Sequence, residues 1–124
     1  MIIKYRDTVD DYIYPPRRAT EGSAGFDVYT YKNEVFPPGE IVTVDFGIAL
    51  KPDRDVFVML CERSSLHKRG LELVNSIGII DNDYRGSVKA KIRNFTDKTV
   101  KIYEGEALCQ LVPFYQGHVE FENS

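Results

Sequence analysis

Apolar residues occur along this chain in short runs, and several of these runs alternate with polar residues at a period of two. No stretch keeps the 3.6-residue apolar period of a long amphipathic helix. Clusters of Gly, Pro, Asn and Asp separate the runs roughly every ten residues, as turns between strands do. The pattern favours an all-β barrel or sandwich. The predicted strands are Ile2–Tyr5, Val28–Tyr31, Glu34–Phe36, Ile41–Leu50, Val56–Cys61, Leu71–Val74, Ile77–Ile80, Val88–Ile92, Thr99–Tyr103, Ala107–Phe114 and Val119–Phe121.

Three of these segments carry more specific predictions. Val56–Cys61 is continuously apolar, which is typical of a strand buried on both faces. After Val88, basic residues alternate with apolar ones, so we expect a half-buried strand with a basic outer face. The tetrapeptide Pro37–Glu40 suits a type II turn with proline and glycine at its central positions.

The segment from Glu62 to Gly70 departs abruptly from the strand pattern. Its composition, ERSSLHKRG, predicts a short helix ended by Gly70. Ser64 and Ser65 would then lie near the helix N-terminus, where free N–H groups attract anions. Arg63 could bind a phosphate through two parallel hydrogen bonds. A solvated basic turn capped by serine is the alternative, and the segment alone favours it.

The stretch Asn75–Asn94 has two apolar arms around the turn-forming cluster DNDYRG, which predicts a strand–turn–strand hairpin. Asp81 in that turn could act as a general base toward water. The ring of Tyr84 could pack on a sugar or a base, and exposed strand backbone could read the edge of a heterocycle. The simpler interpretation is that these side chains belong to an ordinary solvent-exposed loop. A loop of small residues before Asp27 either delivers that carboxylate to a site or simply connects two strands.

Composition narrows the classes of function. The chain has 124 residues, 43% of them hydrophobic and 28% charged, as expected of one soluble domain. It has no apolar run long enough to span a bilayer and no signal-like start, so we expect no membrane association and a cytoplasmic location. The net charge of −3 argues against direct nucleic-acid binding. Two histidines give little basis for a histidine metal site, and Cys61 and Cys109 are expected to be buried free thiols.

Four segments stand in a distinctive order, namely AGFD at 24–27, RSS at 63–65, GIIDNDYRG at 78–86 and GEALCQL at 105–111. Together they resemble the first four motifs of the homotrimeric dUTP pyrophosphatases, or dUTPases, over roughly residues 16–112. The resemblance implies a jelly-roll-like β-barrel and a homotrimer with active sites shared between subunits. It also implies Mg²⁺-assisted hydrolysis of dUTP to dUMP and pyrophosphate, which keeps uracil out of DNA and supplies dUMP for dTTP synthesis. A viral source would place this activity in the host cytoplasm.

The resemblance also implies roles for single residues. Asp81 would be the general base that directs water at the α-phosphorus, Tyr84 would pack on deoxyribose and exclude a 2′-hydroxyl, and Asp27 would order water and metal. Mg²⁺ would be held mainly by the substrate phosphates, with no direct protein ligand. The implied uracil site is Asn75 with backbone at Gly78 and Ile80. The implied triphosphate site is Arg63, Ser64, Ser65 and Gln110.

The sequence departs from the family pattern at three places. The family's fifth motif, a glycine-rich C-terminal arm that closes over the phosphates, has no match here, and without such an arm we expect lower turnover with little change in base preference. Ala107 stands where the fourth motif usually has a basic residue. The segment Leu66–Gly70 is one residue shorter than is usual, which makes it similar to dCTP deaminases.

Two alternative functions follow from these departures. A dCTP deaminase would need a catalytic glutamate where this chain has Lys91, and a lysine does not shuttle protons as a carboxylate does. We therefore rank deamination well below dUTP hydrolysis. The other alternative is a nucleotide-binding or regulatory protein that kept the fold and lost turnover. Asp81, Tyr84 and the phosphate-site residues occurring together argue against that loss.

Overall fold

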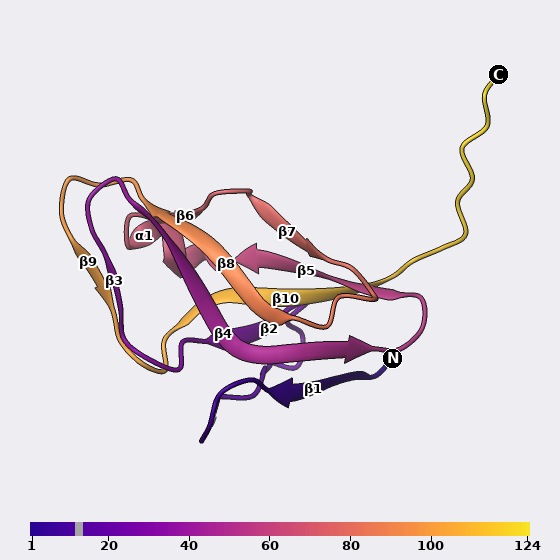
Figure 1. Ribbon diagram of the computed structural model, residues 1–124, viewed down its shortest axis with the longest axis horizontal. Helices are drawn as coiled ribbons and strands as arrows, with labels where there is room; N and C mark the ends of the chain where they lie inside the picture. The colour runs from indigo at the N-terminus through magenta and orange to yellow at the C-terminus, as the bar shows by residue number, and fades with distance from the viewer. Residues whose placement is uncertain (12–13) are drawn as a thin grey trace.

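The computed structural model describes residues 1–11 and 14–124 and shows two antiparallel β-sheets packed face to face, with a small ribbon and a short helix (Figure 1). The first sheet has the order β1 (Ile3–Asp7), β4 (Ile41–Pro52), β8 (Ser87–Asn94) and β6 (Leu71–Leu73). The second has the order β2 (Phe26–Tyr29), β10 (Ala107–Tyr115), β5 (Val56–Glu62) and β7 (Ile77–Ile80). The ribbon pairs β3 (Glu34–Phe36) with β9 (Val100–Ile102), and the helix is α1 (Ser64–Lys68). The all-β prediction with one short helix after RSS is confirmed.

The alternation of apolar and polar residues decides which side of each strand faces the core. In β8, Val88, Ala90 and Ile92 are buried, while the basic residues between them point outward, as predicted. From β4, Phe46 meets them in the core with no exposed surface. Burying a side chain such as Ile92 or Phe46 contributes about 1.5–3 kcal/mol each, so this layer stabilises the fold.

The two arms around Asp81 do not form the hairpin that the sequence predicts. β7 pairs with β5 in the second sheet, with Ile80 opposite Val58. β8 pairs instead with β4 and β6 in the first sheet, with Ala90 opposite Val44. The segment 81–86, called here the 81–86 loop, therefore crosses from one sheet to the other. Apolar alternation specifies which face of a strand is buried but not which strand lies beside it.

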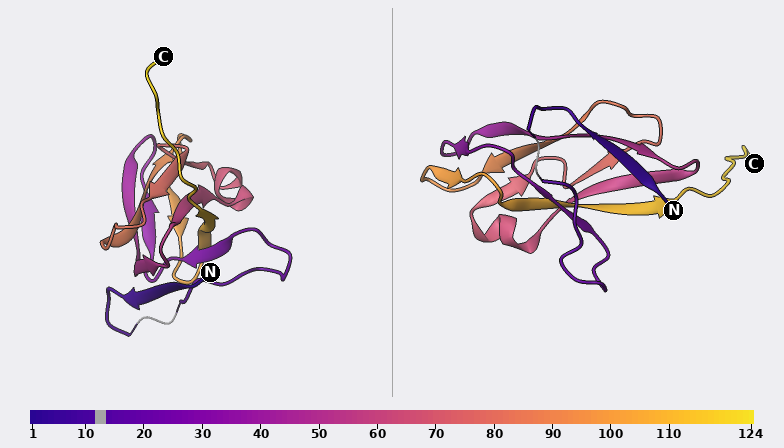
Figure 2. Two further views of the ribbon diagram at one scale, coloured as in Figure 1. Left: turned by 90° about the vertical axis from the view of Figure 1, so that its right-hand side faces the viewer. Right: turned by 90° about the horizontal axis from the view of Figure 1, so that it is seen from below.

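Two further predictions are wrong. The predicted strand Val119–Phe121 is absent, and the chain after β10 leaves the body as an extended tail in which Phe121 is 98% exposed (Figure 2). No strand among the described residues pairs with this segment. β5 is not buried on both faces of the single chain, because Val58 is in the core whereas Phe57 and Met59 are only partly covered.

The turns use the residues that their backbone geometry requires. Gly39 has a φ of 72°, and the N–H of Glu40 donates to the carbonyl of Pro37 over 3.2 Å, as in the predicted type II turn. Gly70 follows α1 with a φ of 82°, which confirms the predicted helix end. Asn94 is fully buried, and its amide donates to the carbonyls of Phe36 and Lys98 over 2.8 and 2.7 Å. This side chain thus ties the end of β8 to the ribbon.

No helix among the described residues has the length and hydropathy of a membrane-spanning segment.

Candidate functional site

One group of predicted site residues lies where β2, β10 and β5 meet the start of α1. In the strand register, Gln110 on β10 is directly opposite Asp27 on β2. Arg63 follows β5, and its Nε atom lies 3.1 Å from Oδ1 of Asp27. The side-chain amide of Gln110 donates to the carbonyl of Glu62 over 3.3 Å. Together with the exposed hydroxyls at the helix start, they form what we call the Arg63 cluster, namely Asp27, Arg63, Ser64, Ser65 and Gln110.

Local sequence explains this close assembly. A Cβ atom at Gly25 would overlap the side-chain amide of Gln110, so the glycine of the AGFD segment leaves room for that side chain in its present position. The main-chain N–H of Arg63 donates to the carbonyl of Leu108 over 3.2 Å, which fixes the point where β5 turns into the helix. Arg63 is half-buried and the Asp27 side chain is mostly buried, so the ion pair is partly shielded from solvent.

The second group lies along β7 and in the 81–86 loop. Asp81 is exposed, and the carbonyl of Asp81 accepts from the N–H of Tyr84 over 3.1 Å in a tight turn. The Tyr84 hydroxyl donates to the carbonyl of Ser87 over 2.8 Å, and its ring lies against Gly86. The loop thus presents a carboxylate and a fixed, half-exposed ring next to each other.

The predicted uracil-binding residues lie on or just before β7. Gly78 is opposite Leu60 of β5 and Ile80 is opposite Val58. The side chain of Ile80 is buried in the core, so only its backbone is available to a ligand. Asn75 is exposed in the turn before the strand. The 81–86 loop continues directly from this strand, so both can contact one ligand.

The structure does not bring these two groups together within one chain. Asp27, Gln110 and Cys61 stand in one row across the second sheet, with Ile77 of β7 at its far end. Across the sheet, three strand spacings separate β2 from β7, which is about 14 Å. Along the chain, four residues separate Ile77 from Asp81, which is about 13 Å. Figure 1 accordingly shows α1 on the left of the molecule and the 81–86 loop, which connects β7 to β8, well to its right. Asp81 and the Arg63 cluster of one chain therefore lie too far apart to contact the same phosphate group.

An apolar surface begins beside Gln110 and covers the outer side of the second sheet. Val112, Met59 and Ile79 are directly opposite one another on β10, β5 and β7, and the side chain of Ile79 is 56% exposed. The rings of Phe57 and Phe114 stack with their centroids 5.5 Å apart. We call this surface the outer apolar face, and it comprises Phe57, Met59, Cys61, Ile77, Ile79, Val112 and Phe114. It explains why β5 reads as apolar on both sides.

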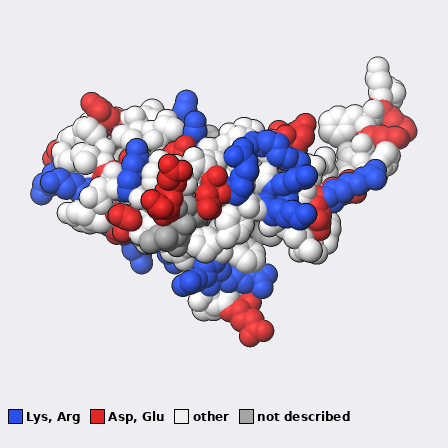
Figure 3. All heavy atoms as spheres, turned by 60° about the horizontal axis from the view of Figure 1, so that its bottom comes forward, with Lys and Arg blue, Asp and Glu red and all other residues white. Residues whose placement is uncertain are grey.

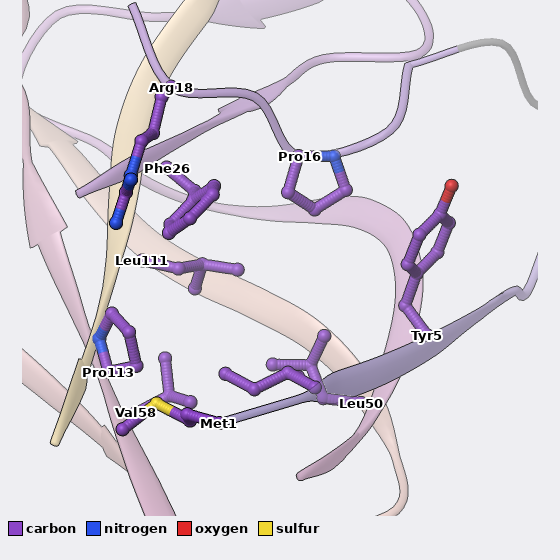
Figure 4. A pocket seen from close by; sticks show the side chains of 10 residues that line it. Met1, Tyr5, Pro16, Arg18, Phe26, Leu50, Val58, Leu111 and Pro113 are labelled. Atoms are coloured by element: carbon purple, nitrogen blue, oxygen red, sulfur yellow. The ribbon is translucent and has the colours of Figure 1, made fainter. Parts of the chain in front are cut away.

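A separate cavity of about 310 Å³ lies between β1 and the second sheet (Figure 4). Its walls are apolar, apart from Arg18, whose guanidinium carbon lies 4.8 Å from the centroid of the Phe26 ring. No residue that the sequence assigned to a site lines this cavity. It is therefore distinct from both groups described above.

Positive charge gathers on part of the surface around β1, as Figure 3 shows. A shallow hollow of about 200 Å³ there is lined by Lys4, Arg6, Lys51 and Arg85. Lys4 and Lys51 are directly opposite each other in neighbouring strands, an arrangement that concentrates like charge. The Arg63 cluster lies away from this hollow. The charge within the cluster therefore comes from its own members, Arg63 and Asp27.

The described residues contain no group of three or more His, Cys, Asp and Glu side chains arranged to hold a metal ion. Both cysteines are free thiols, and they point to opposite faces of the second sheet because Cys61 is opposite Gln110 and Cys109 is opposite Glu62. Burial raises the pKa of both thiols, so neither is poised as a thiolate.

The structure shows the surroundings of the positions that depart from the family pattern. Arg69, in the short segment after RSS, donates to Oε1 of Glu106 over 2.8 Å and to the carbonyl of Lys101 over 2.7 Å. Glu106, the acid before Ala107, is thus paired with a basic residue at the end of α1. Lys91, at the position of the deaminase glutamate, is exposed on the outer face of the first sheet, away from both groups of site residues.

Sequence reasoning missed two residues of the 81–86 loop. The side-chain amide of Asn82 donates to the carbonyls of Asp53 and Val56, both over 2.8 Å. Nη1 of Arg85 donates to the carbonyl of Asn82 over 2.6 Å. Their partners are backbone carbonyls, which any residue type supplies, so no sequence motif could have revealed these contacts.

Known proteins resemble this chain over nearly its whole length. The sequence profile of the family described as dUTPase matches residues 11–124. The deoxyuridine 5'-triphosphate nucleotidohydrolase of Lactococcus lactis is 39% identical over 108 residues, which cover 80% of this chain and 72% of that protein. The corresponding protein of Escherichia phage T5 is 34% identical over 112 residues, covering 83% and 76%. The crystal structure of a dUTPase from Streptococcus mutans matches with a TM-score of 0.85 and 31% identity over 94% of this chain and 98% of that one.

Proposed function

The chain belongs to the dUTPase family, and we propose that it hydrolyses dUTP to dUMP and pyrophosphate at a site completed by two copies of the chain. The observation that carries the second part is the separation of Asp81 from the Arg63 cluster. The two groups have complementary chemistry, because one offers a base and a nucleoside-binding strand while the other offers a cation, an amide and hydroxyls. Neither group alone can both hold and hydrolyse a nucleoside triphosphate.

The outer apolar face supports a second copy as the missing half. It is continuous with Gln110, so a chain that covered it would bring its own surface beside the Arg63 cluster. Burial of such a patch drives association. In a closed ring, each copy would supply Asp81 to the site of one neighbour and receive Asp81 from the other neighbour. Every copy would then have a complete site. We propose a homotrimer of this kind.

Asp81 is proposed as the general base. Its carboxylate takes a proton from water while the water oxygen bonds to the α-phosphorus of dUTP. The bond from the α-phosphorus to the oxygen that bridges to the β-phosphorus breaks, and pyrophosphate leaves with that electron pair. The products are dUMP and pyrophosphate, with the proton first on Asp81 and then returned to solvent. The tight turn at Tyr84 keeps this carboxylate at a fixed place on the loop.

The Arg63 cluster of the neighbouring copy is proposed to bind the phosphates. Arg63 can contact two phosphate oxygens at once, and the hydroxyls of Ser64 and Ser65 and the amide of Gln110 can donate to others. These donors stabilise negative charge that moves toward the leaving pyrophosphate.

Selection for deoxyuridine is proposed to rest on β7 and the ring of Tyr84. The fixed ring would lie against deoxyribose, where a 2′-hydroxyl would collide with it. Asn75 and the backbone at Gly78 and Ile80 would pair with the edge of uracil. Cytosine reverses the donor and the acceptor at N3 and at the group on C4, so buried polar groups would be left unpaired.

Mg²⁺ fits this donor set as an ion carried by the substrate. Magnesium is commonly bound by one or two carboxylates together with substrate phosphates, and Asp27 is the acid next to the proposed phosphate site. When bound, Mg²⁺ would supply charge neutralisation on the triphosphate.

Pyrophosphate release tests the function directly. The purified chain with Mg²⁺ is given dUTP, dCTP, dTTP and UTP in parallel reactions. The proposal predicts release from dUTP alone, and formation of ammonia and dUTP from dCTP would point to deamination instead. No release from dUTP, combined with protection of the protein by dUTP against thermal unfolding, would indicate a nucleotide-binding protein without turnover.

A further inference from the structure

Asn82, the residue after the proposed base, connects the 81–86 loop to a different part of the fold. Its side-chain nitrogen donates to the carbonyl oxygens of Asp53 and Val56, each over 2.8 Å. An amide nitrogen carries two hydrogens, so these two bonds use its full donor capacity. The side chain is half-buried, which strengthens such bonds relative to those on an open surface.

The turn that receives Asn82 is itself held in place. It joins β4 to β5, and its own N–H of Val56 donates to the carbonyl of Asp53 over 3.3 Å. The N–H of Ile2 donates to Oδ2 of Asp53 over 2.7 Å from one side. The N–H of Gln116 donates to the carbonyl of Asp55 over 2.7 Å from another. The 53–56 turn is therefore a fixed support rather than a free loop tip.

Asn82 is also held through its main chain. Its carbonyl accepts from Nη1 of Arg85 over 2.6 Å, and the carbonyl of the preceding Asp81 accepts from the N–H of Tyr84. Asp81 has no comparable contact to the 53–56 turn of its own. Since β7 ends at Ile80 and the loop then crosses between sheets, the amide of Asn82 is the contact that joins the loop tip to that turn.

We propose that Asn82 is a positioning residue for the reaction, and that its amide sets the direction of the Asp81 carboxylate toward the water it activates. This inference rests on the proposed function, in which Asp81 is the base. A general base works only within hydrogen-bond reach of its proton, and small displacements of such a group are costly. Loss of the two bonds releases the loop from the 53–56 turn while β7 and the Tyr84 ring keep the nucleoside site.

Two variants separate the hydrogen bonds from side-chain volume. Asn82→Leu keeps the four side-chain heavy atoms and their branching without a donor, and Asn82→Ala removes both the donor and the branched group. For both variants we expect kcat for dUTP to fall by about 10–100-fold, as expected when a catalytic group is misplaced by about 1 Å. The Kd of the non-hydrolysable analogue α,β-imido-dUTP should change by less than about 3-fold, because nucleoside binding uses other groups.

A double-mutant cycle distinguishes positioning from a general loss of structure. In the Asp81→Asn background, Asn82→Ala should change the residual rate by less than about 2-fold, because there is no base left to direct. Asp53→Ala is the matched control, since it removes the bond from the N–H of Ile2 to the Asp53 carboxylate. It leaves both the main-chain bond from Asp53 to Ile2 and the carbonyls that Asn82 uses. It should leave kcat within about 2-fold even if the thermal midpoint falls.

The outcomes separate this inference from the proposed function. If wild type hydrolyses dUTP, Asp81→Asn does not, and Asn82→Ala keeps normal kcat, the positioning role is wrong while the proposed function stands. An equal loss in Asp53→Ala, or an undiminished loss in the Asp81→Asn background, would also overturn the role. If wild type releases no pyrophosphate from dUTP, the proposed function and the role of Asn82 fail together.

Discussion

The Nε atom of Arg63 lies 3.1 Å from Oδ1 of Asp27, and this pair joins the end of β5 to β2 at the start of α1. The pair uses one of the five N–H donors of the guanidinium, which leaves the two Nη atoms to face a ligand. Arg63 thus contacts Asp27, which we propose to lie beside the metal, and we propose that it also binds the phosphates. This fork geometry is the basis of the first prediction.

Replacing Arg63 by lysine keeps the charge but removes the fork. We expect Arg63→Lys to raise KM for dUTP by about 10-fold, because a lysine cannot hold Asp27 and bind phosphate bidentately at once. Arg69→Lys is the matched control, since Arg69 also bonds an acid, Glu106, outside the Arg63 cluster. Steady-state kinetics of both variants checks this, and equal effects on KM would remove Arg63 from its proposed role.

The ring of Tyr84 should decide between ribose and deoxyribose. Tyr84→Ala opens the space that the ring fills, so the ratio of kcat/KM for dUTP over UTP should fall by about 10-fold or more. Tyr84→Phe loses only the hydroxyl bond to the carbonyl of Ser87 and should keep most of the discrimination. Parallel kinetics with both nucleotides measures the ratio. An unchanged ratio in Tyr84→Ala would show that another group excludes the 2′-hydroxyl.

Self-association should depend on the outer apolar face. Ile79→Lys places a charge on this face, so we expect the assembled species to dissociate at micromolar concentration and dUTP hydrolysis to be lost with it. Val35→Lys is the control, because Val35 is similarly exposed but lies on β3, outside that face. Sedimentation velocity gives the mass of each species. A monomeric wild type with full activity would contradict the shared site.

Stability should fall with rising pH because of Glu34. Burial raises the pKa of this carboxyl, as does Asp45 nearby, while Lys32 opposes the shift, and one carboxyl oxygen has no hydrogen-bond partner. The folded state thus prefers the protonated form. The stability that this preference provides is complete below the usual pKa of 4.5 and is lost as pH rises through the raised value.

Glu34→Gln removes this titration while keeping the shape of the side chain. The variant should unfold at a higher temperature than wild type near neutral pH, by a few degrees, and the difference should vanish at about pH 4. Thermal unfolding across that range measures it. Glu40→Gln, at an exposed turn position, should show no such trend. A lower midpoint for Glu34→Gln at neutral pH would show that the charged form is stabilised instead.

The strand pattern and most turns could be predicted from the sequence, because burial of one face leaves a period of two that is local to each strand. Which strands lie side by side in space is not specified by the local sequence. Hence the segments beside Asp81 read as a hairpin, although β7 and β8 belong to different sheets. Val119–Phe121 reads as a strand for the same reason, since its alternation does not say whether a partner lies beside it.

The site residues were predicted through four motifs, and the structure brings Asp27, Arg63 and Gln110 together as a cluster. It places Asp81 at the far end of the second sheet from this cluster. No local sequence pattern specifies the distance between them. The contact of Asn82 was equally hidden, because its partners are the carbonyls of Asp53 and Val56. Apolar residues on both sides of β5 are the sequence signal of the outer apolar face.

Mixed assemblies test the shared site most directly. Asp81→Asn and Arg63→Ala are each expected to hydrolyse dUTP very slowly, and Asp81→Asn should still bind the nucleotide. Refolded together in equal amounts, they should recover about one quarter of the wild-type rate, because one neighbour contact in four joins an intact Asp81 to an intact Arg63 cluster. Recovery near that level would establish that two chains complete each site. No recovery, from mixed species that sedimentation shows to have formed, would mean that Asp81 and Arg63 of one chain act together and would contradict this account.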